Sequence, residues 1–186
     1  LNIKCRKSGI KPDCVVIVAT IRALKMHGGV PKDELKNENV GALKKGLVNL
    51  ERHIINIKKF GIEPIVAINH FILDTNHEIK TIQEFCKKIG VDVSVSKHWS
   101  DGGSGAKDLA RKVIKICKKT SKKKFNYLYS DSISPWEKIE KIAKEIYGAN
   151  RITASDDVKE KLKKFEKNGY GKLPVCIAKT QYSFSV

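Results

Sequence analysis

The chain lacks several features that define common protein classes. No apolar run in its 186 residues approaches the length of about 18 residues that a membrane-spanning helix needs. Its five cysteines form no Cys-x-x-Cys pair, so the usual sequence signature of a zinc or thiol-redox centre is missing. The phosphate-binding patterns Gly-x-x-x-x-Gly-Lys-Ser/Thr and Gly-x-Gly-x-x-Gly are also absent. The sequence therefore predicts no membrane span, no metal site and no phosphate loop within this chain.

The chain also has far fewer acidic than basic residues. It carries 37 Lys and Arg against 20 Asp and Glu, a formal net charge of +17. The lysine-rich stretches 112–124 and 159–167 contain apolar residues at helical spacing, which is typical of solvated helix faces. The sequence lacks the alternation of aromatic and basic residues that is typical of a surface binding single-stranded nucleic acid. We therefore interpret the excess of basic residues as solvated helix faces. The alternative is a non-catalytic basic α/β module that binds nucleic acid.

One apolar stretch, residues 14–19, leads into a group of polar residues and glycines. Its continuous run Cys-Val-Val-Ile-Val-Ala predicts a parallel strand covered on both faces. The residues that follow it are Thr20, Arg22, Lys25 and His27, and then the paired glycines Gly28 and Gly29. Ligands of open α/β sheets bind at the carboxyl ends of the strands, and glycine permits close backbone approach or a positive φ. The stretch therefore predicts a binding pocket, without indicating a reaction.

The remaining pattern predicts a β-α-β train followed by a helical part. The predicted strands are 14–19, 62–68 and 91–95, and the predicted helices between and after them are 42–60, 75–88 and 107–119. Two more helices, 135–147 and 155–168, and a last strand, 174–178, follow. We expect a three-layer α/β fold, with a mostly parallel sheet and helices on both faces. A core of residues 1–120 and a second part of residues 121–186 are expected, with Thr20, Asn69 and Lys97 at one edge of the sheet.

Four segments of the chain resemble one enzyme family in order and spacing. They are VATIRALKMHGG (18–29), VAINHFILDT (66–75), KHWSDGGSGA (97–106) and LPVCIAKTQYSFS (173–185). All four are similar to segments of formate–tetrahydrofolate ligases, and the resemblance extends over essentially the whole chain. This resemblance implies a fold like that of the P-loop NTPases, with the P-loop itself outside the chain.

Two aromatic residues stand out because each follows the carboxyl end of a predicted strand. From the residues alone, Phe71 and Trp99 are best explained as ordinary core aromatics. The resemblance instead implies that the two rings sandwich the pterin of tetrahydrofolate, with Val95 as an apolar wall. The family usually has a proline after the phenylalanine, whereas this chain has Ile72.

The resemblance also implies which residues line the rest of the active site. They are Thr20, His27, Gly28, Gly29, Asn69, Asp74, Thr75, Lys179, Thr180 and Gln181. Asp74 is equally readable as a helix N-cap or as a ligand contact. The glycines Gly102, Gly103 and Gly105 favour a plain turn after Trp99 rather than a phosphate cradle.

The family activates formate with ATP to form formyl phosphate, which N10 of tetrahydrofolate attacks to give 10-formyltetrahydrofolate. Its P-loop, and the arginine expected to hold formyl phosphate, would lie N-terminal to this segment, so the main catalytic residues are expected outside the chain. The resemblance further implies Mg2+ with ATP, a monovalent cation such as K+, and a homodimer or homotetramer at full length. Neither nucleic acid nor a membrane is an expected partner, and both cytoplasm and mitochondrion stay open as locations.

Overall fold

The protein consists of two compact units. The computed structural model describes residues 1–119, 125–178 and 184. One unit comprises Pro12–Lys124, and the other comprises Leu1–Lys11 together with Phe125–Val186. The sequence-based division at residue 120 assigned residues 1–11 to the first part, whereas in the structure they group with the second. The reason is local, because Arg6 forms an ion pair with Asp131 (3.0 Å) and lies 4.2 Å from the ring centroid of Tyr127.

The unit Pro12–Lys124 is built on a parallel sheet of three strands. These are β1 (Cys14–Ala19), β2 (Glu63–Asn69) and β3 (Asp92–Ser96), in the order β1-β2-β3. The register aligns Ala19 with Ile68 and Asn69 with Ser96. The predicted parallel arrangement is confirmed, and Thr20, Asn69 and Lys97 lie at the same carboxyl edge.

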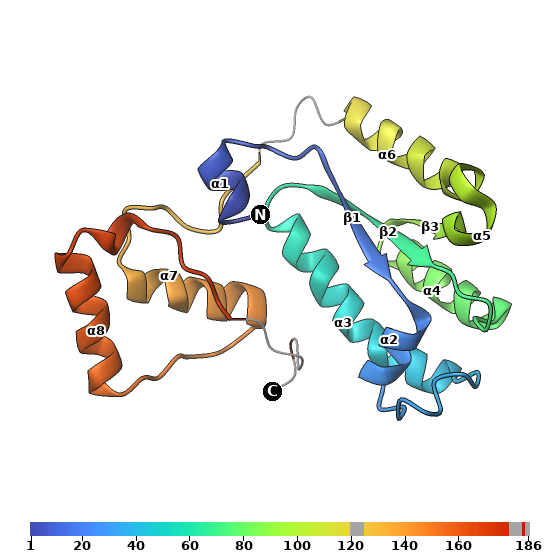
Figure 1. The fold of residues 1–186 in the computed structure, drawn as a ribbon, viewed down its shortest axis with the longest axis horizontal. Helices are drawn as coiled ribbons and strands as arrows, with labels where there is room; N and C mark the ends of the chain where they lie inside the picture. Colours follow the sequence, from blue (N-terminus) through green and yellow to red (C-terminus); the bar gives the residue numbers. More distant parts are fainter. Residues whose placement is uncertain (120–124, 179–183, 185–186) are drawn as a thin grey trace. The chain divides into compact units, whose positions relative to one another are not determined.

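Helices cover the two faces of this sheet. Figure 1 shows α3 (Val40–Lys58) and α4 (Asn76–Lys88) on one face and α6 (Lys107–Lys119) on the other. The core between β2 and its two helices is aliphatic, which follows from the three-and-four spacing of apolar residues along α3. Its buried members include Leu43, Leu47, Leu50, Ile54, Val66, Ile68, Ile79 and Ile82. The predicted three-layer α/β fold is therefore confirmed.

One expectation for β1 was wrong, because only one of its faces is fully covered. Ile17 and Ala19 pack with the core, but Val16 and Val18 are 38% and 66% exposed. Side chains alternate along a strand, so these two valines lie on the opposite face. That face of β1 is open because the strand lies at the edge of the sheet and α6 packs mainly across β2 and β3.

A short helix that the sequence did not predict, α2 (Ile21–His27), follows β1 and packs tightly on α3. Two glycines make this contact possible. A Cβ on Gly28 would lie 1.9 Å from the carbonyl oxygen of Ala42, and one on Gly46 would lie 1.9 Å from that of Leu24. The backbone at Gly28 therefore closely approaches α3.

A buried ion pair joins α2 to α4. Lys25 and Glu78 are 1% and 0% exposed, and the Lys25 Nζ to Glu78 Oε1 distance is 2.9 Å. Lys25 also donates to the carbonyl oxygen of Asn37 (2.8 Å), and Glu78 accepts from the backbone N–H groups of Asn39 (3.1 Å) and Thr75 (3.3 Å). Lys25, which the sequence grouped with the polar residues of the pocket, is thus a core residue.

The unit Leu1–Lys11 with Phe125–Val186 is helical. It contains α1 (Lys4–Ser8), α7 (Pro135–Ile142), a π-helical turn (Ala143–Tyr147), α8 (Asp156–Lys167) and a 3-10 turn (Tyr170–Lys172). Ser134 caps α7 together with Glu137, as the Ser-Pro pair predicted. Lys138 is buried, and its Nζ donates to the carbonyl oxygens of Gly171 (2.5 Å) and Leu173 (3.2 Å). Burial lowers the pKa of Lys138.

The strand predicted for residues 174–178 does not form. These residues carry no strand pairing, and the N–H of Val175 donates to the hydroxyl of Tyr129 at 2.9 Å. A strand needs a paired neighbour for its backbone groups. The described part of this unit contains no strand that could serve as one.

The Lys25–Glu78 pair gives a first prediction. Glu78→Gln leaves the Lys25 ammonium buried without its carboxylate, and breaking a buried pair costs about 3–5 kcal/mol. We expect that loss of unfolding free energy in urea denaturation of the chain. The control is Glu84→Gln, which removes the exposed Lys80–Glu84 pair (3.9 Å) and should cost less than about 1 kcal/mol. Equal, small losses in the two variants would contradict the structural role of Glu78.

A second prediction concerns acid stability. Hydrogen bonds from the Lys112 ammonium (2.7 Å) and the Ser94 hydroxyl (2.6 Å) hold the pKa of Asp108 below its usual value. The stabilisation is fully present above the unfolded-state pKa of about 3.9 and is lost as pH falls through the lower folded-state pKa. Asp108→Asn should therefore weaken the fall of stability below about pH 4, measured by urea denaturation at several pH values. An unchanged pH profile, matching that of the exposed-site control Asp157→Asn, would refute this link.

Candidate ligand-binding site

Three loops meet at the carboxyl edge of the sheet in the unit Pro12–Lys124. One follows each strand, because parallel strands end at a common edge. We call the set the rim: Thr20 to Arg22 after β1, His70 to Asp74 after β2, and Lys97 to Ser100 after β3. The rim holds both aromatic residues that the sequence singled out.

The loop after β2 is closed by Asp74. Its Oδ2 accepts from the N–H of Phe71 (2.8 Å), and its own N–H donates to the Phe71 carbonyl oxygen (2.9 Å). Thr75, rather than Asp74, is the N-cap of α4, and Glu78 completes the capping box. The N-cap alternative for Asp74 was therefore wrong. The carboxylate shapes the turn that carries Phe71, even though Ile72 stands where the family usually has proline.

The loop after β3 carries Trp99 on a short helix, α5 (His98–Asp101). Trp99 is 49% exposed, and its indole N–H donates to the carbonyl oxygen of His70 at 2.5 Å. The loop then folds back, since the N–H of Lys97 donates to the Gly105 carbonyl oxygen (3.1 Å), and a Cβ on Gly105 would lie 2.5 Å from the Lys97 carbonyl carbon. Trp99 therefore lies at the surface, hydrogen-bonded to the residue before Phe71.

Phe71 is contacted from the β1 side. The guanidinium carbon of Arg22 lies 5.0 Å from the centroid of its half-buried ring. All three strands thus contribute to the surroundings of the two rings. Phe71 and Trp99 are brought onto one rim, as predicted from the positions of their strands.

Two buried polar atoms near the rim lack partners among the described residues. They are Ser96 Oγ and His70 Nδ1, whose residues are joined by the hydrogen bond from the N–H of His70 to the Ser96 carbonyl oxygen (3.1 Å). Buried polar atoms normally have a protein or water partner. Asn69 is half-buried beside them, while Val95 packs against the aliphatic core below the rim.

The other predicted site residues in this unit have local roles in the fold. Thr20 Oγ1 accepts from the N–H of Ala23 (3.2 Å) and caps α2, and His27 is exposed in the last turn of that helix. Gly29 has the positive φ that was expected, 98°. Thr75 donates its hydroxyl hydrogen to Glu38 Oε2. Lys179, Thr180 and Gln181 lie outside the described residues.

The described residues bring no group of three or more His, Cys, Asp or Glu side chains together in a way that could hold a metal ion. None of the described helices is long and apolar enough to cross a membrane. The free cysteines are Cys5, Cys14, Cys86, Cys117 and Cys176, and burial raises the pKa of Cys86 to about 11. Cys86 is therefore a thiol at neutral pH, which suits a core residue rather than a nucleophile.

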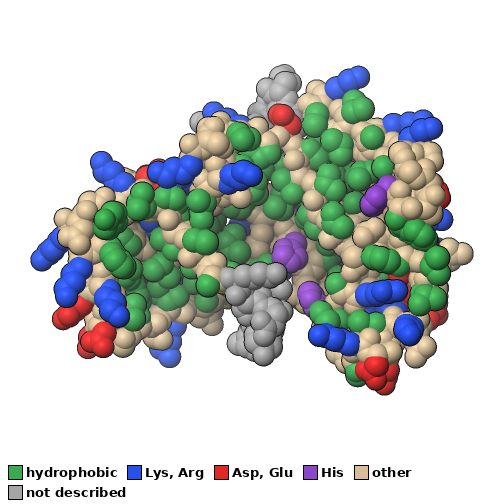
Figure 2. Space-filling model, viewed as in Figure 1, with side chains coloured by type: hydrophobic (Ala, Val, Ile, Leu, Met, Phe, Trp, Pro, Cys, Tyr) green, Lys and Arg blue, Asp and Glu red, His purple; other side chains and the backbone are tan. Residues whose placement is uncertain are grey.

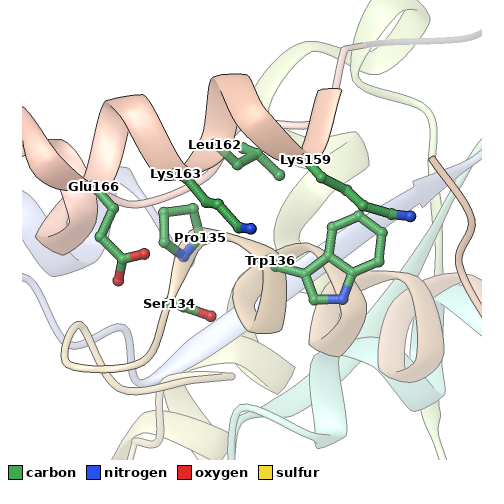
Figure 3. A pocket seen from close by; sticks show the side chains of 7 residues that line it. All are labelled: Ser134, Pro135, Trp136, Lys159, Leu162, Lys163 and Glu166. Atoms are coloured by element: carbon green, nitrogen blue, oxygen red, sulfur yellow. The ribbon is translucent and has the colours of Figure 1, made fainter. Parts of the chain in front are cut away.

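The helical unit has a separate cavity of about 400 Å3 between α7 and α8. Figure 3 shows Trp136 and Pro135 on one side and Leu162 with Lys163 on the other. Two of its polar side chains are already engaged, since Ser134 caps α7 and Lys159 pairs with Asp156 (3.1 Å). The lining is largely apolar, and its polar members are Ser134, Lys159, Lys163 and Glu166. We take the rim as the candidate ligand site because it lies at the carboxyl edge of the sheet, where ligands of open α/β sheets bind.

Sequence reasoning missed three participants in and around the rim. Arg22 was noted as a polar residue, but its position over Phe71 depends on how α2 lies against the neighbouring loop. The His70 carbonyl oxygen was not considered at all. Thr75-x-x-Glu78 is a capping-box pattern that could have indicated Glu78, although its ion pair with Lys25 had no sequence signal.

Comparisons with known proteins match the whole chain to one family. The family profile described as formate–tetrahydrofolate ligase matches residues 1–186. The formate–tetrahydrofolate ligase of Pelagibacter ubique is 60% identical over 185 residues, which is 100% of this chain and 33% of that protein. Those of Zymomonas mobilis and Rhizobium johnstonii are 53% and 52% identical over 184 residues, 99% of this chain and 33% of each.

The chain therefore spans about a third of the length of these curated relatives. The expected order of the four resembling segments is matched by an alignment that runs from end to end. On this similarity, and on a fold of the expected class, the chain belongs to the formate–tetrahydrofolate ligase family.

Proposed function

We propose that this chain supplies the folate-binding rim of a formate–tetrahydrofolate ligase, which forms 10-formyltetrahydrofolate from formate, ATP and tetrahydrofolate. The observation that carries the proposal is the hydrogen bond from the Trp99 indole to the His70 carbonyl oxygen, next to Phe71. It holds a half-exposed indole beside a second aromatic ring on the edge where ligands of α/β sheets bind.

In this proposal the pterin stacks on Phe71 and Trp99. An aromatic face attracts a flat heterocycle without requiring a fixed pattern of hydrogen bonds. Ser96 Oγ and His70 Nδ1 would supply polar contacts, directly or through water, because both are buried without described partners. We propose that further residues beside the rim line the same site. Near β2 they are Asn69, Asp74 and Thr75, with Val95 below the rim, and near β1 they are Thr20, His27, Gly28 and Gly29. Lys179, Thr180 and Gln181 are proposed to line the active site from the C-terminal segment.

The phosphoryl-transfer part of the reaction is proposed to depend on residues outside this chain. Bound ATP with Mg2+ would activate formate as formyl phosphate, but the described residues contain no metal-ligand cluster and the sequence has no P-loop pattern. This chain therefore orients tetrahydrofolate, and we derive no catalytic step from it. A K+ requirement and a homodimeric or homotetrameric full-length enzyme belong to the same proposal. The named relatives are bacterial, which favours the cytoplasm over the mitochondrion.

The alternative of a basic nucleic-acid-binding module is less favoured. Figure 2 shows Lys and Arg side chains scattered over the visible surface among apolar and other residues, without a continuous basic face in that view. Backbone recognition of nucleic acid requires several cations gathered along one track. The charge of +17 instead suits solvated helices that also attract anionic substrates.

The role of Trp99 gives a third prediction. Trp99→Ala in the full-length polypeptide removes one stacking partner, worth roughly 1–3 kcal/mol, and should raise the tetrahydrofolate KM by about one to two orders of magnitude. The melting temperature should change little because the ring is half exposed, whereas loss of a buried Trp would cost roughly 3–5 kcal/mol.

Two further variants sharpen this test. Trp99→Phe keeps an aromatic face but loses the donor to His70, so its KM should fall between those of the wild type and Trp99→Ala. Trp136→Phe changes the other tryptophan, in the helical unit, and should leave the folate KM unchanged. A large drop in melting temperature for Trp99→Ala with an unchanged KM would show that the ring serves stability alone.

A fourth prediction concerns the 186-residue chain on its own. Without a P-loop, it lacks the backbone amides and cations that stabilise a transferring phosphoryl group. We expect the purified chain to form no 10-formyltetrahydrofolate from formate, ATP and tetrahydrofolate, as measured by chromatography of the products. Turnover that is abolished by Trp99→Ala would exclude a contaminating enzyme and would overturn the prediction.

A further inference from the structure

Arg22 occupies an unusual position for an exposed arginine. It is the second residue of α2, three positions after the end of β1, and its guanidinium carbon lies 5.0 Å from the centroid of the Phe71 ring. No described carboxylate forms an ion pair with it. Its one specific contact among the described residues is therefore the face of an aromatic ring from the neighbouring loop.

We infer that Arg22 is a positioning residue for tetrahydrofolate, which fixes the ring plane of Phe71 and leaves the opposite ring face free for the pterin. The inference rests on the proposed function of Phe71 in stacking. An arginine guanidinium is planar and favours a parallel position over an aromatic face, where the ring quadrupole attracts its charge. Because Arg22 lies over one face of Phe71, a stacking ligand would use the other face.

The arrangement gives each ring of the rim its own anchor on a neighbouring loop. Trp99 is held by its hydrogen bond to the His70 carbonyl oxygen, and Phe71 is held by Arg22. Arg22 comes from the β1 side and Trp99 from the β3 side, with Phe71 between them on the β2 loop. The relative orientation of two stacking surfaces is thus set from both sides of one loop.

A purely structural role for Arg22 does not fit its surroundings. The Phe71 loop is closed independently by Asp74, which bonds the Phe71 backbone at both its N–H and its carbonyl oxygen. Arg22 is also exposed, so truncating it would create no buried void and leave no buried charge unpaired. Its removal should therefore free the ring of Phe71 without unfolding the loop.

The test uses Arg22→Met and Arg22→Lys in the full-length polypeptide, with tetrahydrofolate as the varied substrate. An exposed cation over an aromatic ring accounts for roughly a 2- to 5-fold effect, so Arg22→Met should raise the tetrahydrofolate KM by about that factor. The loss should fall on KM rather than kcat, with the KM for ATP and the melting temperature unchanged. Arg22→Lys keeps the charge but lacks the planar guanidinium, so its tetrahydrofolate KM should lie between those of the wild type and Arg22→Met. Arg151→Met, at an exposed arginine of the helical unit, is the matched control.

A double-mutant comparison tests whether Arg22 acts through Phe71. Because Phe71→Ala removes the ring that Arg22 orients, adding Arg22→Met to it should raise the KM no further. Independent, multiplied losses would mean that Arg22 contacts the substrate itself, and this would overturn the inference. The inference would also be overturned if Phe71→Ala raised the tetrahydrofolate KM but Arg22→Met left it at the wild-type value. Failure of the proposed function is distinguishable, because Phe71→Ala and Trp99→Ala would then both leave the KM unchanged.

Discussion

The buried Lys25–Glu78 ion pair is the interaction on which the geometry of the rim depends. It joins the helix that follows β1 to the helix that follows β2, and both partners also bond the backbone at residues 37 to 39. Replacing such a pair by apolar residues can be neutral for stability, so its importance here lies in geometry. By fixing α2 relative to α4, it sets where Arg22 lies against the Phe71 loop. A buried pair thus joins the helix that carries Arg22 to the helix that follows the Phe71 loop.

Close packing of α2 on α3 supports the same geometry. Gly28 and Gly46 allow backbone contacts that any Cβ would prevent, so α2 lies against α3 at a distance fixed by main-chain atoms rather than by adaptable side chains. The paired glycines after α2 therefore divide their roles: Gly28 serves the helix contact, and Gly29 adopts the positive φ that turns the chain. The paired-glycine motif therefore also positions α2 against α3.

The open face of β1 departs from what its sequence predicted. A parallel strand normally has both faces covered, and the run Cys14–Ala19 has the composition for that. Val16 and Val18 are nevertheless exposed, since the described helices that pack on this sheet leave that side of its edge strand uncovered. Residues 174–178, also strand-like in sequence, likewise have no paired neighbour. In both places the local pattern led to a wrong expectation, because pairing and coverage of a strand depend on neighbouring elements that the local pattern does not specify.

The sequence by itself determined the elements that depend on local periodicity and capping. The three strands lie within one residue of their predicted positions, α6 has its predicted bounds, and the Ser134-Pro135 start of α7 is as expected, because hydrophobic spacing and cap residues act over a few positions. The strand order also placed Phe71 and Trp99 on one edge. Only the tertiary structure decided that Lys25 is buried with Glu78, that Arg22 lies over Phe71, and that Trp99 bonds the His70 carbonyl oxygen. These contacts join residues 29 to 53 positions apart, and no local rule relates side chains whose distance is set by how whole helices and loops pack.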